Sequence, residues 1–109
     1  MATTYKVLGQ SNPSATTLTT LYTVPSATQA VVSSIVIANL AASSATFRIA
    51  VRPAGASIAN SQYIAYDITV GASDSTVLTL GLTLGATDVL SVYASTSTVT
   101  FSAYGSEIA

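Results

Sequence analysis

The sequence predicts an all-β fold, a single antiparallel β-sandwich or jelly-roll-like domain of about eight strands. Three observations support this prediction. Val, Ile, Thr and Tyr are abundant while Glu, Lys and Gln are scarce, which favours strands over helices. Apolar and polar residues alternate with a period of two in segment after segment. Turn-forming residues separate these segments at short, even spacings, as in sandwiches and barrels.

Four strands are predicted in the first half of the chain, over residues 5–10, 18–24, 30–39 and 46–52. The Ser11-Asn12-Pro13 cluster ends the first strand. Pro25 ends the second, because the residue before a proline favours extended backbone. In the fourth strand the side chains that point inward are Phe47, Ile49 and Val51, since they alternate with residues of the opposite face.

The segment 30–39 is the most apolar of the chain, and both of its faces are apolar. The alternating sets are Val31, Ile35 and Ile37 on one face and Val32, Val36 and Ala38 on the other. Continuous apolar runs of this kind are typical of strands that are buried on both faces. The segment is therefore predicted to be a central strand covered on both sides.

After a loop over residues 53–61, four more strands are predicted over 62–70, 75–84, 88–94 and 99–104. The inner face of the first holds Ile64, Tyr66, Ile68 and Val70. The leucines at 78, 80, 82 and 84 share one face of a strand, whereas a helix would spread them around its circumference. Gly81 within this strand predicts a bulge or a close backbone approach.

The length of 109 residues predicts one domain over residues 1–109, in which residues 1–4 can form an extended N-terminal arm. Half of the residues are hydrophobic, which is enough to build a core. The absence of Cys excludes a disulfide framework. The N-terminus does not have the pattern of a signal peptide, and we expect no membrane-spanning segment.

The chain carries three cationic and four acidic side chains, with a net charge of −1. Three cations are too few for the electrostatic footprint of a nucleic-acid-binding protein or for an anionic membrane surface. Free soluble domains usually carry a larger net charge. Either Ser and Thr hydrate this surface well enough, or partners cover much of it in a permanent assembly; we favour the second interpretation.

Catalytic chemistry has few residues to use here, since the chain has neither His nor Cys. Nucleophilic triads and ordinary zinc sites are thereby excluded. Lys6 could form a Ser-Lys pair only if it were buried, and we expect an exposed lysine. Asp74 and Asp88 each precede a strand, where Asp usually binds nearby backbone in a turn. We therefore expect no catalytic residue, no cofactor and no metal.

Five residues are predicted to contact partner proteins: Tyr5, Lys6, Arg48, Arg52 and Tyr63. Arg48 and Arg52 share the outward face of one strand, either as solvated charges, with Arg48 facing Asp67 on a neighbouring strand, or as an anchor for a partner. Tyr63, like Tyr93, is a candidate for exposure and could pack between subunits or stack on a sugar.

The whole chain resembles a family of small virion structural (decoration or accessory) proteins of tailed bacteriophages. The resemblance rests on TTYKVLGQ (3–10), LYTVP (21–25), AVVSS (30–34), FRIAVR (47–52), QYIAYD (62–67), LTLGATDV (82–89) and YGSEI (104–108). It implies a non-enzymatic protein of the mature particle, assembled in the host cytoplasm, and it assigns no functional residue.

The leading hypothesis is a capsid decoration (cement) protein that bridges major capsid subunits and stabilises the shell. Its expected partners are the major capsid protein or other virion proteins, and we expect a homo-oligomer, with a trimer favoured. One alternative is a tail, neck or fibre component. Another is a carbohydrate-binding module for attachment to the host.

Overall fold

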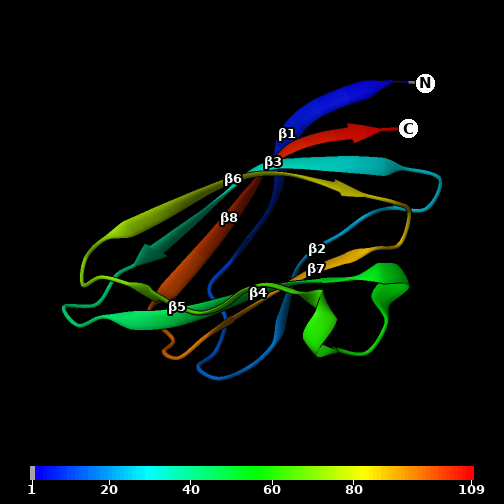
Figure 1. Ribbon diagram of the computed structural model, residues 1–109. Helices are drawn as coiled ribbons and strands as arrows, with labels where there is room; N and C mark the ends of the chain where they lie inside the picture. Colours follow the sequence, from blue (N-terminus) through cyan, green and yellow to red (C-terminus); the bar gives the residue numbers. More distant parts are fainter. Residues whose placement is uncertain (1) are drawn as a thin grey trace.

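The computed structural model describes residues 2–109, and eight strands account for most of them (Figure 1). The strands are β1 (Thr3–Ser11), β2 (Thr19–Thr23), β3 (Gln29–Asn39), β4 (Ala45–Arg52), β5 (Tyr63–Val70), β6 (Ser75–Leu84), β7 (Val89–Ala94) and β8 (Val99–Ile108). Two short 3-10 helices, η1 (Pro53–Gly55) and η2 (Asn60–Gln62), lie in the loop between β4 and β5. Over residues 2–109 the structure has no helix with the length and hydrophobicity that a membrane crossing requires.

The strands form two four-stranded sheets. Sheet A has the order β1-β8-β3-β6 and sheet B the order β2-β7-β4-β5, and all neighbouring strands are antiparallel. All connections except the one between β4 and β5 cross from one sheet to the other, which is the arrangement of a jelly roll. The predicted β-sandwich is therefore confirmed.

The core lies between the two sheets and is made of apolar side chains from both. Phe47 of sheet B and Phe101 of sheet A are fully buried, and their rings meet edge to face with centroids 6.2 Å apart. One polar side chain, Asn39, is buried at the end of β3. Its amide nitrogen donates to the carbonyl oxygens of Ser43 and Gly71, and its oxygen accepts from the Thr98 hydroxyl, so it joins three loops at one end of the sandwich.

The central position of β3, between β8 and β6, is confirmed, but the predicted burial of both of its faces is wrong. Val32, Ile35 and Ile37 are buried together, whereas Val31, Val36 and Ala38 are only partly covered. The sandwich has two layers, so only one face of β3 meets the core; the bulge at Ser33, which adds one residue to β3, places Val32 on the same face as Ile35 and Ile37.

The predicted inner face of β5 is also largely wrong. Val70 is buried, but Ile64, Tyr66 and Ile68 are exposed, and the buried residue in the middle of the strand is Ala65. Asp67 has a φ of 52°, and the register against β4 shifts at this point. β5 is also the edge of sheet B, so inward-facing side chains there are covered from one side only.

The remaining strands follow the prediction closely. Leu78, Leu82 and Leu84 face the core, although Leu80 is 43% exposed. The register shifts beside Gly81, whose φ is +64°, so the predicted bulge is present. β8 continues to Ile108, four residues beyond its predicted end at residue 104.

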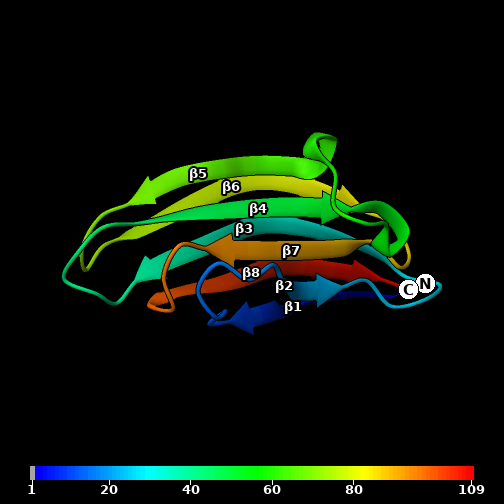
Figure 2. The same cartoon turned by 90° about the horizontal axis from the view of Figure 1, so that it is seen from below.

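The predicted N-terminal arm coincides with the start of β1. Thr3 and Thr4 pair with Ile108 and Glu107 of β8, and the amide of Ala2 donates to the carbonyl oxygen of Ala109. Residues 2–4 therefore lie along their own chain here, and Met1 is outside the described residues. The two termini are side by side at one end of the sandwich (Figures 1 and 2).

Candidate partner-binding surfaces

The acidic residues at the turns bind backbone. The carboxylate of Asp74 accepts from the amide of Ser75, and that of Asp88 accepts from the amides of Gly85 and Ala54. The predicted turn roles of both residues are thereby confirmed. Within residues 2–109 no three acidic side chains lie close enough together to hold a metal ion.

The five residues predicted to contact partners do not form one surface. Tyr5 and Lys6 are on β1 of sheet A, whereas Arg48, Arg52 and Tyr63 are on β4 and β5 of sheet B. Since the two sheets face each other across the core, their outer faces look in opposite directions. The structure therefore has two candidate surfaces, one on each sheet.

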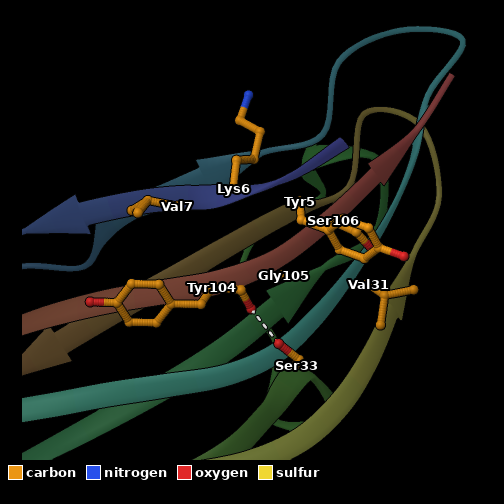
Figure 3. A pocket seen from close by; sticks show the side chains of 8 residues that line it. All are labelled: Tyr5, Lys6, Val7, Val31, Ser33, Tyr104, Gly105 and Ser106. Atoms are coloured by element: carbon orange, nitrogen blue, oxygen red, sulfur yellow. Dashed lines mark hydrogen bonds between the residues drawn. The ribbon is translucent and has the colours of Figure 1, made fainter. Parts of the chain in front are cut away.

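The first surface is a shallow hollow on the outer face of sheet A, where β1, β8 and β3 run side by side (Figure 3). We call it the sheet A hollow. Its lining is mostly apolar and comprises Tyr5, Lys6, Val7, Val31, Ser33, Tyr104, Gly105 and Ser106. Tyr5 is 84% exposed, which makes it the most exposed of the large apolar or aromatic side chains in the described chain.

The sheet A hollow forms where the strands are irregular. Ser33 is the extra residue of the β3 bulge, and its hydroxyl donates to the carbonyl oxygen of Tyr104 at 3.0 Å. β8 and β3 lie very close together beside it. A methyl group at position 105 would overlap the carbonyl group of Val31 and lie 3.1 Å from the Cα of Val32. Gly105 thus permits the local geometry that leaves the hollow between the two tyrosines.

Lys6 contributes little of its charge to this hollow. Figure 3 shows its side chain on the opposite side of β1 from the tyrosines, and its ammonium group forms an ion pair with Glu107 at 3.2 Å. Glu107 also accepts a hydrogen bond of 2.5 Å from the hydroxyl of Tyr22 on β2. The hydrogen bond from Tyr22 and, to a smaller extent, that from Lys6 lower the pKa of Glu107 below its usual value. Burial, followed by the hydrogen bond to Glu107, raises the pKa of Tyr22. The three residues link sheet B to sheet A, which is a structural role.

The second surface is on the outer face of sheet B, and we call it the tyrosine–arginine cluster: Arg48, Tyr63, Tyr66, Asp67 and Tyr93. The guanidinium group of Arg48 lies 4.1 Å from the ring centroid of Tyr66 and 4.3 Å from that of Tyr93. Its nitrogens donate to both carboxylate oxygens of Asp67, at 2.6 and 3.3 Å. The predicted pairing of Arg48 with Asp67 is therefore confirmed. This pairing lowers the pKa of Asp67 and raises that of Arg48.

Tyr63 extends the cluster toward the loop between β4 and β5. Its ring meets that of Tyr66 edge to face, with centroids 4.9 Å apart and an angle of 84° between the planes. A second shallow hollow lies beside these two rings and Asn60. Because the rings are almost perpendicular, they do not form a single flat platform.

Arg52 has a different role from Arg48. Its guanidinium group donates to the carbonyl oxygens of Gly55 and Ala56 and contacts the hydroxyl of Ser91 at 3.4 Å. These contacts hold the beginning of the loop that follows β4. Arg52 therefore supports the shape of the loop, and its hydrogen-bonding capacity is largely used within the chain.

Tyr104 and Tyr66 are among the residues of these surfaces that were not predicted as contacts. Tyr104 was assigned only to a strand, and Tyr66 was predicted to face inward. No local signal indicates Tyr66, because alternation with the outward-facing Asp67 predicts that it faces inward; the irregular backbone at Asp67 places it beside Arg48. For Tyr104 the signal is the following Gly105, which marks a strand irregularity.

Comparison of the chain with protein-family models, with curated proteins and with solved structures finds no match. The two surfaces therefore have to be interpreted from their own chemistry.

Proposed function

We propose that this chain is a non-enzymatic structural protein that holds other protein subunits together, and that it serves as a capsid decoration protein in the virion of a tailed bacteriophage. The observation that carries the proposal is the position of two tyrosine-bearing surfaces on opposite sheets. A protein that reinforces a shell must contact two neighbours at once. Surfaces that look in opposite directions suit that task.

The composition of the two surfaces fits contact with protein. Tyrosine and arginine are enriched at interfaces and supply much of the binding free energy there. Arg48 is already fixed between two rings and a carboxylate, so little side-chain freedom is lost when a partner covers it. With so little net charge, recognition depends on shape and apolar contact.

The proposed mechanism is stabilisation by binding. A protein that binds the assembled lattice and not its separated subunits stabilises the lattice by about 2.7 kcal/mol per site when its free concentration is 100 times its Kd. The proposed partners are the major capsid protein or other virion proteins, with several copies of this chain acting together. Copy number distinguishes the shell from the tail, neck or fibre, since a shell protein is present in amounts comparable with the major capsid protein.

The test uses particles that lack this protein, to which purified chain is added before DNA release is followed on heating. One variant alters the sheet A hollow (Tyr5→Ser with Tyr104→Ser) and another alters the tyrosine–arginine cluster (Arg48→Ala with Tyr66→Ser). Bridging predicts that each variant still binds particles but no longer raises the temperature of DNA release. A variant with all four changes should not bind.

Leu40→Ser is the matched control, because Leu40 is 69% exposed and belongs to neither surface. It should bind and protect like the wild type, and circular dichroism should show that all variants are folded. If a variant with one surface altered protects particles fully, bridging through these two surfaces is wrong. If the wild-type chain binds no particle component, the proposed function itself is wrong.

A further inference from the structure

We infer that the free edge of β6 is a contact between two copies of this chain, which pair antiparallel around a two-fold axis. The inference concerns the contact of the chain with itself and does not depend on the proposed function. It begins with the two narrow sides of the sandwich. Figure 2 shows β5 and β6 at one side, and β1 and β2 at the other.

The β5–β6 side carries most of the exposed apolar side chains. Nine large apolar or aromatic side chains are exposed in the described part of the chain, and five of them are on these two strands: Ile64, Tyr66, Ile68, Val77 and Leu80. Val77, on β6, is 59% exposed. Single exposed apolar residues are common on monomers, but β6 itself carries two of them, Val77 and Leu80, on a strand edge that no other strand covers, which favours an interaction there.

The β1–β2 side has the protection that free edges usually have. β1 carries Lys6 and is followed by Pro13, while β2 has five residues and is followed by Pro25. β6 has neither kind of protection. Its ten residues, Ser75–Leu84, include no charged residue and no proline.

The chemistry of a strand edge defines what can bind it. An edge strand presents a row of backbone amide donors and carbonyl acceptors that another extended strand can pair. In a two-fold contact β6 of one copy pairs with β6 of the other, so a charged residue near the axis would lie close to the same charge of the second copy. β6 has no charge to repeat, whereas pairing of β1 with itself would bring two copies of Lys6 together.

The neighbouring strand does not oppose this contact. Asp67 is the charged residue of β5, and it is already paired with Arg48. Within β5 and β6 the contact therefore places no unpaired charge, and Asp74, in the turn before β6, lies just outside the paired residues, with its carboxylate accepting from the amide of Ser75. A second copy of the chain is thus the occupant that the charge pattern favours.

The regular part of β6 sets the register. Residues 75–79 pair with β3 without interruption, and the register shifts beside Gly81. A two-fold axis at Val77 places Val77 of one copy opposite Val77 of the other, and Ser75 of each copy opposite Thr79 of the other. Opposite residues then belong to the same face of the joined sheet. With this axis the paired residues are 75–79, because residues 80–84 would lie opposite the turn that precedes β6; at about 3.4 Å per residue the paired edge is about 17 Å long. The contact is therefore smaller than the roughly 800 Å² that each partner buries in a standard interface, and we expect the dimer to depend on concentration.

Sedimentation velocity over a series of concentrations tests the inference. We expect a species of twice 11.0 kDa. Val77→Lys, which places two lysines opposite each other, should raise the dissociation constant at least about tenfold, or 1.4 kcal/mol. Leu40→Lys adds the same charge at a site that is 69% exposed and should leave the constant unchanged. Circular dichroism of both variants reports whether they are folded.

Disulfide formation gives a second measurement, because the natural chain has no Cys. Directly opposite residues of antiparallel strands have Cα atoms about 4.5–5.5 Å apart, which is within the range that a disulfide spans. Val77→Cys should therefore form a disulfide-linked dimer under mild oxidation, and Leu40→Cys should form no disulfide-linked dimer. A wild-type chain that is monomeric at every concentration, a trimer, or a dimer unaffected by Val77→Lys would each overturn the inference.

Discussion

Replacing Gly105 by alanine tests the packing of sheet A most directly. Gly105 is on β8 and pairs with Lys6 on one side and Val32 on the other. A methyl group at this position would overlap the carbonyl oxygen of Val31 and lie 3.0 Å from its carbonyl carbon. Carbon atoms in favourable contact are about 3.5–4.0 Å apart, so β3 and β8 would have to separate.

The cost follows from what the separation breaks. Forcing an extra methyl group into a well-packed site costs about 1–3 kcal/mol. Weakening one or two ladder hydrogen bonds between β8 and β3 adds about 1 kcal/mol for each. We therefore expect Gly105→Ala to lower the free energy of unfolding by about 2–5 kcal/mol, a large part of the ~5–15 kcal/mol typical of a domain.

Urea unfolding followed by circular dichroism measures this change. With a slope of about 1.5 kcal/mol per M, a loss of 3 kcal/mol lowers the midpoint by about 2 M. Gly71→Ala is the matched control, because the nearest atoms to its methyl group would be those of the Asp74 side chain, at ordinary contact distances of 3.5 and 3.6 Å. If Gly105→Ala unfolded at the same urea concentration as Gly71→Ala, the close approach of β8 to β3 would be refuted.

Four further predictions concern the core, the link between the sheets and the loop after β4. Phe101→Ala should cost about 3–5 kcal/mol in urea unfolding, because Phe101 is fully buried against Phe47. Tyr22→Phe should cost about 1.5–3 kcal/mol, since the lost hydrogen bond is to a charged group. Because the pKa of Glu107 is lowered in the folded protein, its contribution to stability is complete above the unfolded-state pKa of 4.5 and is lost as pH falls through the folded-state pKa. A Glu107→Gln variant should therefore lose less stability between pH 5 and pH 3 than the wild type. Arg52→Ala should speed proteolytic cleavage within residues 53–62, detected by mass spectrometry, with little change in the urea midpoint.

The sequence was sufficient to predict the class of fold and the approximate bounds of every strand, because period-two patterning and turn residues are local signals. Side-chain direction was less predictable, as β3 and β5 show. Register shifts, one in β3 and two where β5 pairs with β4, disturb the alternation, and they depend on the hydrogen-bonding partner, which is distant in the sequence. Val32 and Tyr66 were therefore assigned to the wrong faces.

One contact of the candidate surfaces could be predicted because the chain has few charged residues. With three cations and four acidic residues in the chain, the pairing of Arg48 with Asp67 had few competitors. The link between Tyr22 and Glu107 joins residues 85 positions apart on different sheets, and no local pattern indicates it. Tyr5 and Tyr104 form one hollow because β1 and β8 pair, which also depends on topology.

The two narrow sides of the sandwich have opposite physical characters, and this difference connects folding with assembly. On the β1–β2 side, Gly9 lets β1 approach the backbone of β2, and Tyr22, Glu107 and Lys6 bind one another, so the polar groups there are used within the chain. On the β5–β6 side an uncharged edge remains open.

Two copies joined at β6 would present each outer surface twice. On a repetitive lattice the second contact of such a pair is effectively intramolecular, at a local concentration on the order of millimolar. Individually weak contacts through Tyr5 or Arg48 would then be enough for stable binding, which is why loss of pairing by Val77→Lys should also weaken binding to particles.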